Sequence, residues 1–251
     1  MKIIGIIPAR YASTRFPGKP LAQIQGKSMV QRVYEQAKSA RKLEDVWVAT
    51  DDLRIEEHVL SFGGKVVMTM REHPSGTDRC FEALQKSGIP ADAVINIQGD
   101  EPFIQPAQID ALADLITKPE VNIATLVKRI TDPSLLLDVN KVKVVLDKNN
   151  KALYFSRSPI PYFTGVPNEL ILSKGAFYKH VGIYAYTVET LRTITHLEKS
   201  FLEQTESLEQ LRWLENGVSI YTALTSFESP AIDTPDDLEK MLKELEAKTA
   251  G

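Results

Sequence analysis

Three cations lie in one short loop that directly follows the first apolar run of the chain. The segment "PARYASTRFPGKP", residues 8–20, contains Arg10, Arg15 and Lys19. A turn after a strand presents backbone N–H groups, and three positive charges beside them suit a polyphosphate. The loop has neither the GxxxxGK[ST] pattern of a P-loop nor a GxGxxG pattern, so a solvated basic loop is an alternative interpretation.

Two acidic residues follow a later apolar segment. In "NIQGDEP", Asp100 and Glu101 come immediately after a predicted buried strand. Mg²⁺ prefers one or two carboxylates together with phosphate oxygens, so acids and cations facing one cleft indicate a magnesium ion held beside phosphates. The alternative is an ordinary turn acid beside Gly99.

A third acid comes from the C-terminal segment "SPAIDTPDDLEK". Here Thr234 suits a helix N-cap, Pro235 the first helical position, and Asp236 and Asp237 the helix N-terminus. Asp233 has no such structural use. It is therefore a candidate for the second metal carboxylate.

Apolar β-type runs and amphipathic helical stretches alternate over the first half of the chain. The expected strands are "KIIGIIP", "DVWVATD", "KVVMT" and "AVINIQG"; the expected helices run through "SMVQRVYEQAKSA", "LRIEEHVLSFG", residues 77–86 and "PAQIDALADLIT". This order predicts an α/β fold with a mostly parallel central sheet flanked by helices. Ligands gather beyond the carboxyl ends of such strands, at residues 8–20, 50–54, 70–77 and 98–106.

The middle of the chain is β-rich and predicts an additional antiparallel section. "VNIATLVKRI", "NKVKVVLD" and "KALYFSRSPIPYF" read as strands, and "DKNNK" as a hairpin turn. After "HVGIYAYTVETL" come the helical run "SLEQLRWLEN", the strand "SIYTALT" and a terminal helix from Pro235. We expect a single domain, residues 1–251, with a β-rich insertion at about 121–190.

Composition excludes several classes of protein. The 251 residues are 43% hydrophobic and 25% charged, which is typical of a globular protein, and the net charge of −3 argues against coating nucleic acid or an anionic membrane. No apolar run reaches the roughly 20 residues that span a bilayer, and no secretory signal is recognised. The single cysteine, Cys80, fits a reducing compartment and a packing role, so we expect a cytoplasmic protein.

Motifs along most of the chain, from Ile4 to Glu239, carry a resemblance to a known family. They are "IIPARYASTRFPGKPL", "VATD", "HPSGTDR", "NIQGDEP", "VKVVLD", "ALYFSR", "HVGIYAY", "LEQLRWLENG" and "DTPDDLE". Together they resemble the 3-deoxy-manno-octulosonate (KDO) cytidylyltransferase family. The resemblance implies Mg²⁺-dependent transfer of CMP from CTP to the anomeric hydroxyl of KDO, with release of pyrophosphate, in lipopolysaccharide biosynthesis. It also implies a nucleotide-diphospho-sugar transferase fold and a homodimer, with the insertion contributing to the sugar site and the dimer contact.

The resemblance assigns residues to CTP and to the metal. Arg10, Arg15 and Lys19 would bind the phosphates, with Arg15 and Lys19 nearest the departing pyrophosphate. Asp100 and Asp233 would hold Mg²⁺. The segment "MTMREHPSGTDR" is similar to the family's cytosine-reading segment, and the residues it assigns there are Arg71, Ser75 and Gly76. Without the resemblance, "HPSGT" predicts a turn followed by a helix with Thr77 as its N-cap.

The resemblance also assigns a set of neutral and charged polar residues to KDO. They are Gln98, Arg157, His180, Tyr184, Glu209 and Gln210. Arg157 would pair with the sugar carboxylate, because its planar fork suits bidentate contact. Each has a structural alternative: Arg157 as an ion pair, Tyr184 as core, Glu209 as a solvated helix face.

Two rival functions differ from this one in substrate or in class. One is a cytidylyltransferase for another sugar acid such as N-acetylneuraminate. The other is a non-catalytic nucleotide-binding module. The presence of both Asp100 and Asp233 beside three loop cations argues against the module, since a sensor needs no metal site made of two acids. The partners expected are therefore the small molecules CTP and KDO, with no nucleic acid and no membrane.

Overall fold

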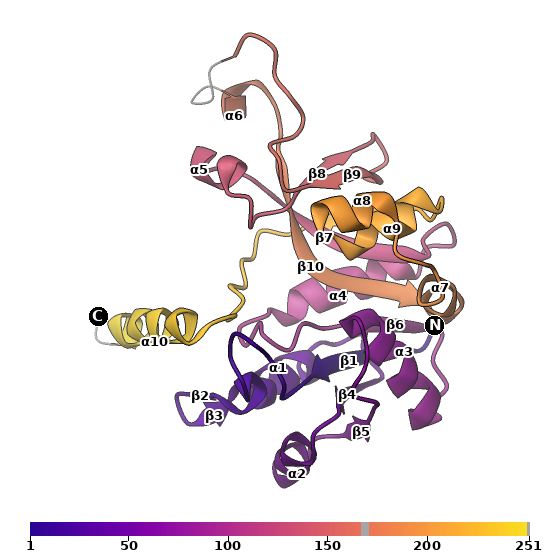
Figure 1. The fold of residues 1–251 in the computed structure, drawn as a ribbon, viewed down its shortest axis with the longest axis vertical. Helices are drawn as coiled ribbons and strands as arrows, with labels where there is room; N and C mark the ends of the chain where they lie inside the picture. Colours follow the sequence, from indigo (N-terminus) through magenta and orange to yellow (C-terminus); the bar gives the residue numbers. More distant parts are fainter. Residues whose placement is uncertain (167–170, 250–251) are drawn as a thin grey trace. The chain divides into compact units, whose positions relative to one another are not determined.

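A computed structural model describes residues 1–166 and 171–249 (Figure 1). The chain divides into two compact units. Unit 1 comprises Met1–Asp110 and Glu228–Gly251, and unit 2 comprises Ala111–Phe227. Residues 167–170 of the predicted β-rich insertion and residues 250–251 of the predicted single domain lie outside the described residues.

Unit 1 contains a fully parallel sheet with the strand order β6-β1-β4-β5. The strands are β1 (Ile3–Ala9), β4 (Asp45–Thr50), β5 (Val66–Met68) and β6 (Ala93–Asn96). Ile4 of β1 pairs with Asp45 on one side and with Val94 on the other. Because the strands are parallel, the loops that follow them leave the sheet at the same edge.

Helices cover the parallel strands, which is why these strands read as continuous apolar runs. The helices of unit 1 include α1 (Met29–Lys38), α2 (Leu53–Ser61) and α3 (Gly76–Ser87). The first packs on β1 and β4, the second on β4 and β5, and the third on all four strands. Ile4, Ile6 and Ile7 of β1 are all buried.

Side-chain caps set where the helices begin. Ser28 caps α1 and Asp52 caps α2. The predicted N-cap Thr77 is wrong, because the Ser75 hydroxyl accepts the N–H groups of Thr77 and Asp78 and α3 begins at Gly76. The sequence offers two possible caps, Ser75 and Thr77, and the helix begins after the first of them.

The rest of unit 1 joins the two ends of the chain. It contains η1 (Lys19–Leu21), β2 (Gln23–Ile24), β3 (Lys27–Ser28) and α10 (Pro235–Thr249), while α4 (Pro106–Ile116) carries the chain on into unit 2. Ile24 and Met29 form a buried cluster with Ile232 and Met241. This apolar cluster fixes the C-terminal segment against the residues that follow the opening loop.

Unit 2 is mixed, with parallel and antiparallel pairs. Its strands are β7 (Ile123–Arg129), β8 (Lys143–Leu146), β9 (Ala152–Ser156), β10 (Tyr178–Thr187) and β11 (Ile220–Leu224). β7 pairs with β11 in parallel and with β10 antiparallel, and β8 pairs antiparallel with β10 and β9. The predicted hairpin turn is confirmed: the Asp147 N–H donates to the Lys151 carbonyl at 2.9 Å.

Short helices complete unit 2: α5 (Pro133–Leu137), α6 (Ile171–Lys174), α7 (Val188–Ile194), α8 (Phe201–Glu206) and α9 (Glu209–Glu215). The predicted α/β class, with a mostly parallel sheet, flanking helices and an antiparallel section, is confirmed. The hydrophobic patterns of the sequence do not predict η1, α5, α6, α8 or the β2-β3 pair, because elements this short do not show a clear hydrophobic periodicity. Over the described residues, every helix is too short or too polar to cross a membrane.

Candidate functional site

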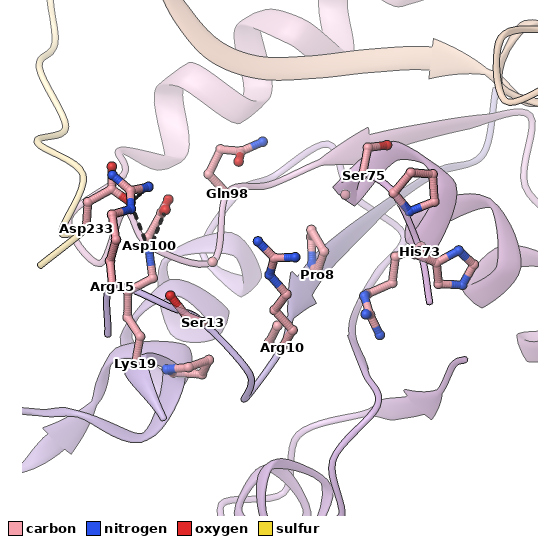
Figure 2. Close-up of a pocket in the computed structure, with 16 residues that line it drawn as sticks. Pro8, Arg10, Ser13, Arg15, Lys19, His73, Ser75, Gln98, Asp100 and Asp233 are labelled. Carbon is pink, nitrogen blue, oxygen red and sulfur yellow. Dashed lines mark hydrogen bonds and ion pairs between the residues drawn. The ribbon is translucent and has the colours of Figure 1, made fainter. Parts of the chain in front are cut away.

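Unit 1 has a pocket at the carboxyl ends of β1 and β6. Its lining comprises Pro8, Ala9, Arg10, Ser13, Arg15, Lys19, Pro20, His73, Pro74, Ser75, Gly76, Arg79, Gln98, Gly99, Asp100 and Asp233. Figure 2 shows two carboxylates and two cations at one end of the view, Ser75 and His73 at the other, and Arg10 and Gln98 between them. Segments far apart in the sequence thus converge on one polar pocket.

The opening loop is held in shape by Tyr11. Its carbonyl accepts the N–H groups of both Ser13 and Gly18 at 2.9 Å. Gly18 has φ +72°, a left-handed conformation that favours glycine, and a Cβ there would lie 3.1 Å from the Tyr11 ring. The Arg54 guanidinium lies over the same ring, 3.3 Å from its centroid. Folded in this way, the loop places Lys19 at the start of η1.

The loop after β6 packs directly on the end of β1. A Cβ at Gly99 would meet the Pro8 carbonyl oxygen at 2.7 Å, so this close approach requires glycine. Asp100 lines the pocket, whereas Glu101 is buried and does not line it. Burial, with the Asp100 charge added, raises the pKa of Glu101 to about 8. Of the predicted acid pair, only Asp100 faces the pocket.

Asp233 is placed by the beginning of α10. The Ile232 N–H donates to the Asp100 carbonyl at 2.9 Å, which brings the two acids together along the backbone. The Asp237 carboxylate accepts the Asp233 N–H at 3.0 Å and the Thr234 N–H and hydroxyl. These bonds, the one from the Thr234 hydroxyl first, lower the pKa of Asp237. The predicted use of Thr234 as cap is confirmed, since its hydroxyl accepts the Asp237 N–H.

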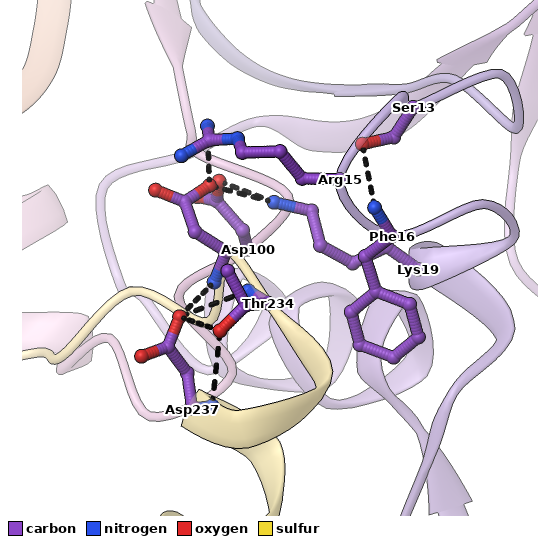
Figure 3. Close-up of polar contacts among 8 residues, drawn as sticks. Ser13, Arg15, Phe16, Lys19, Asp100, Thr234 and Asp237 are labelled. Carbon is purple, nitrogen blue, oxygen red and sulfur yellow. Dashed lines mark hydrogen bonds and ion pairs between the residues drawn. The ribbon is translucent and has the colours of Figure 1, made fainter.

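Lys19 contacts both pocket carboxylates, and Arg15 contacts that of Asp233 (Figure 3). Lys19 Nζ lies 2.8 Å from Asp100 Oδ2 and 3.3 Å from Asp233 Oδ1. Arg15 Nη2 lies 3.2 Å from the same Asp233 oxygen. Arg15 is largely exposed, while the Lys19 side chain is only 16% exposed. Two acids and two cations of the pocket thus form one connected network.

The donor set fits a magnesium ion in its chemistry. Asp100 Oδ2 and Asp233 Oδ1 both approach one cation, Lys19 Nζ, within 3.3 Å, so two hard oxygen ligands converge on one point. Within the described ranges, no group of three or more His, Cys, Asp or Glu side chains could hold a metal. Two carboxylates completed by phosphate oxygens and water are the arrangement that Mg²⁺ commonly uses.

The residues predicted to bind CTP separate into those that line this pocket and one that does not. Arg10, Ser75 and Gly76 line it. A Cβ at Gly76 would lie 3.3 Å from Pro8 Cγ, so a larger residue would crowd the end of β1. Arg71 is exposed and does not line the pocket. The contact of each of these residues with CTP stays a prediction.

The sequence patterns assign no role to two titratable residues of the pocket, Arg79 and His73. Arg79 lies in the first turn of α3, four residues after the N-cap Ser75, and this short spacing was the signal that could have identified it. Its Nη1 donates to Thr69 Oγ1 at 2.6 Å and lies 3.4 Å from Asp51 Oδ1. His73 also lines the pocket, and its Nε2 bonds the carboxylate of Glu82.

The Glu82 carboxylate is a buried ionic centre behind the pocket. Burial alone would raise its pKa, but hydrogen bonds from Lys86, His73 and the Met70 N–H outweigh burial and lower it to about 2. Lys86 Nζ lies 2.7 Å from it, and the Met70 N–H donates at 2.8 Å. Because the centre ties the segment before α3 to the helix itself, it stabilises the wall that carries His73 and Ser75.

Arg157, in unit 2, is held by backbone carbonyls rather than by a carboxylate. Its Nε donates to the Glu206 carbonyl at 2.8 Å, Nη1 to that of Val139 at 3.1 Å and Nη2 to that of Ser207 at 3.3 Å. A guanidinium has five N–H groups, so two have no partner among the residues described. Arg157 is thus held by hydrogen bonds to the backbone rather than by the structural ion pair of the alternative interpretation. Two of its N–H groups are not used by these bonds.

His180 and Tyr184 lie in an aromatic cluster on β10. The His180 ring is 5.1 Å from those of Phe155 and Tyr184, and Tyr184 meets Trp213 edge-on at 5.1 Å. Burial lowers the pKa of His180 to about 3, so the ring is neutral at pH 7. Burial likewise raises the pKa of Tyr184. The Tyr184 hydroxyl is buried and has no hydrogen-bond partner in the described part of the chain.

The remaining residues predicted to bind KDO lie in both units. Gln98 lines the unit 1 pocket, while Glu209 and Gln210 begin α9 in unit 2. Gln210 is buried, and Glu209 accepts a bond from Arg212 Nη2 at 3.1 Å. Glu209 is therefore tied into an ion pair rather than purely solvated. Binding of KDO by these residues stays a prediction.

Comparisons with known proteins agree with the motifs. A family model described as cytidylyltransferase matches residues 4–220. The 3-deoxy-manno-octulosonate cytidylyltransferase of Cytophaga hutchinsonii is 57% identical over 239 residues, which cover 95% of each chain. The enzyme of the same name from Parabacteroides distasonis is 57% identical over 246 residues, covering 96% of this chain and 97% of its own.

A solved structure extends the likeness to three dimensions. The structure of CMP:2-keto-3-deoxy-manno-octonic acid synthetase complexed with CTP covers 99% of this chain and 100% of its own, with 44% identity and a TM-score of 0.91. Sequence and fold thus agree over nearly the whole length, and the resemblance that the motifs carry is confirmed. The chain belongs to the cytidylyltransferase family, among the 3-deoxy-manno-octulosonate cytidylyltransferases.

Proposed function

We propose that this protein transfers CMP from CTP to the anomeric hydroxyl of KDO and releases pyrophosphate, activating KDO for lipopolysaccharide biosynthesis. The observation that carries the proposal is the convergence of Arg15, Lys19, Asp100 and Asp233 on one pocket, in a chain 57% identical to enzymes named for this reaction. Cations for a polyphosphate and two acids for a divalent ion are what nucleotidyl transfer requires.

The cations of the opening loop bind the triphosphate in this proposal. Arg10, Arg15 and Lys19 all line the pocket from one loop, and the Arg15 side chain is largely exposed. Arg15 and Lys19 contact the departing pyrophosphate and stabilise the charge that builds up on it. Both already lie within ion-pair distance of a carboxylate, so each side chain has a partner before the phosphates arrive.

Asp100 and Asp233 would hold the magnesium ion. When bound, that ion neutralises phosphate charge and makes the attacking sugar hydroxyl more acidic. The carboxylates are kept near one another by the Ile232 N–H, which donates to the Asp100 carbonyl. Support for this assignment comes from their shared approach to Lys19 Nζ.

The nucleotide base and the acceptor are assigned by chemistry and resemblance together. Ser75 and Gly76 lie at the start of α3, where the absence of a side chain at Gly76 lets the cytosine edge approach the backbone. Arg71 is a further candidate for contact with the base. For KDO, two unpartnered Arg157 N–H groups suit a carboxylate, and Gln98, His180, Tyr184, Glu209 and Gln210 suit hydroxyls.

No protein nucleophile is needed, because the sugar oxygen attacks the α-phosphorus directly, opposite the pyrophosphate. Positioning and neutralisation of charge then supply most of the rate. Cys80 is buried within α3, which supports its packing role. We further propose a cytoplasmic homodimer: one buried cysteine supports a reducing compartment, and the resemblance supports the dimer.

The test measures pyrophosphate release by the purified protein with Mg²⁺ and CTP. Parallel reactions contain KDO, N-acetylneuraminate or no acceptor. We expect pyrophosphate release only in the reaction that contains KDO. Release only with N-acetylneuraminate would support cytidylyl transfer but show that the acceptor is a different sugar acid. No release with either acid, despite CTP binding, would indicate a non-catalytic nucleotide-binding module.

A further inference from the structure

Lys19 lies at the point on which the two candidate metal ligands converge. Its Nζ is 2.8 Å from Asp100 Oδ2 and 3.3 Å from Asp233 Oδ1. Of the residues that the structure describes, Lys19 alone forms an ion pair with both acids. Arg15, which reaches only Asp233, is 65% exposed, compared with 16% for the Lys19 side chain. Lys19 is therefore the cation that holds the acid pair together.

The backbone of Lys19 is fixed on both sides. Its N–H donates to the Phe16 carbonyl at 3.2 Å, and its own carbonyl accepts the Ala22 N–H at 3.1 Å. Gly18 before it is in the left-handed conformation, and Pro20 after it is buried. With the main chain held, the ammonium moves only by rotation about the side-chain torsions. It can leave the acids without any change of the fold.

An ammonium and a divalent cation cannot share this position. Two carboxylates near one another repel, so in the free protein they need a cation, and Lys19 supplies it. A divalent ion entering here would have to displace Lys19 Nζ and leave that charge beside its own. A triphosphate changes the balance, because its oxygens give the ammonium another partner within the same pocket.

We propose that Lys19 is an exchangeable cation that closes the acid pair of Asp100 and Asp233 to divalent ions until the nucleotide binds. The triphosphate draws the ammonium away, and the two carboxylates then become free to hold the metal. This inference rests on the proposed function, because it takes these two acids as the metal ligands. It makes binding of the nucleotide and of the ion mutually favourable, and it limits loading of the metal without nucleotide.

The test measures Mn²⁺ binding to the full chain without nucleotide, by the loss of the free-ion paramagnetic resonance signal. We expect Lys19→Met to bind Mn²⁺ about tenfold more tightly than the unchanged protein, because the competing charge is removed. Lys27→Met is the matched control: it removes the same charge, but Lys27 pairs with the exposed Glu35 and lies outside the pocket lining. Its affinity for Mn²⁺ should not change.

Further variants separate the possible failures. Lys19→Gln repeats the measurement with a second neutral side chain, and circular dichroism verifies that each variant is folded. Adding Asp100→Asn to Lys19→Met should abolish the gain; a gain that survives would mean that the ion binds elsewhere and would overturn the inference.

Equal or weaker Mn²⁺ binding by both folded Lys19 variants would also overturn it. If the unchanged protein still retains Mn²⁺ when CTP is added, that outcome leaves the metal assignment of the proposed function intact. Failure of every variant to retain Mn²⁺, even with CTP, would overturn both.

Discussion

The polar residues assigned to the nucleotide in unit 1 and those assigned to the acceptor in unit 2 are held in different ways. In the unit 1 pocket, Arg15 and Lys19 are paired with Asp100 and Asp233 through side-chain contacts alone, and Arg15 is largely exposed. In unit 2, the Arg157 guanidinium is bonded to three backbone carbonyls. The side-chain ion pairs of unit 1 can be exchanged for contacts with a ligand, whereas the position of the Arg157 guanidinium is fixed by the fold.

The difference matches the chemistry of the ligand that we propose for each region. A triphosphate with its metal ion carries charges of both signs, so it can take over each half of an existing ion pair with little net loss of electrostatic energy. A sugar acid carries one charge and several hydroxyls, and hydrogen-bonding groups recognise it best when they are already oriented. Exchangeable ion pairs therefore suit the nucleotide, and a rigid polar frame suits the acceptor.

The largest expected effect comes from removing one acid of the exchangeable network. Asp100→Ala should lower turnover about a thousandfold at saturating Mg²⁺, because the metal loses a ligand and Lys19 loses its nearer partner. Pyrophosphate release measures the loss, and circular dichroism should show an unchanged fold. Asp236→Ala, which removes an exposed acid near Asp233, is the control and should keep its activity. Near-normal turnover of Asp100→Ala would rule out the metal assignment.

A second experiment tests whether the fixed frame of unit 2 serves only the acceptor. Arg157→Ala should raise the KM for KDO about a hundredfold and leave the KM for CTP unchanged, because a charge-assisted contact with a carboxylate is lost. Arg157→Lys keeps the charge but not the planar fork, and should fall in between. Steady-state kinetics with each substrate varied in turn measures the split. Equal losses for both substrates would make Arg157 purely structural.

The parallel half of the fold could be predicted from sequence because its signals are local and strong. Four apolar runs alternate with amphipathic helices, and each predicted run became a strand or helix at nearly the predicted place, such as Ile3–Ala9 and Met29–Lys38. Asp233 could be singled out as well, because the four residues after it, 234–237, already had a use at the start of a helix. Asp233 does line the pocket, and its role as a metal ligand stays a prediction.

The rest depends on contacts between segments far apart in sequence. Nothing in the pattern around Arg157 indicates that carbonyls of residues 139, 206 and 207 surround it. The requirement for glycine at Gly99 comes from the Pro8 carbonyl, more than ninety residues earlier. His73 received no role because its bond to Glu82 appears only once α3 is folded. Sequence spacing identified which residues could act, and the tertiary contacts determine how each one is held.

Unit 1 also contains the ion cluster around Glu82, whose contacts we do not expect a ligand to replace. It therefore contrasts with the exchangeable ion pairs of the pocket. The lowered pKa of Glu82, about 2 against an ordinary 4.5, means that its ionised form stabilises the fold. This stability is fully present above pH 4.5 and is lost as the pH falls towards 2. Glu82→Gln should therefore lower the free energy of unfolding at pH 7 by about 2 kcal/mol.

Urea unfolding at a series of pH values measures this effect. The difference between Glu82→Gln and the unchanged protein should shrink as the pH falls from 7 to 3, because below about pH 4.5 the unfolded chain binds a proton at Glu82 that the folded protein does not yet bind. A difference that stays constant with pH would mean that the lost contacts, and not the charge, carry the stability.

The smallest expected effect concerns one oxygen of the fixed frame. The buried Tyr184 hydroxyl has no hydrogen-bond partner among the residues described, so Tyr184→Phe should leave the melting temperature unchanged or slightly raise it. If the hydroxyl is kept for the sugar acid, the same change should raise the KM for KDO about tenfold. Tyr186→Phe is the matched control, because that ring stacks on Tyr184 but is not assigned to the acceptor. A lower melting temperature with an unchanged KM would make Tyr184 a core residue and would place one side chain of the acceptor frame outside the reaction.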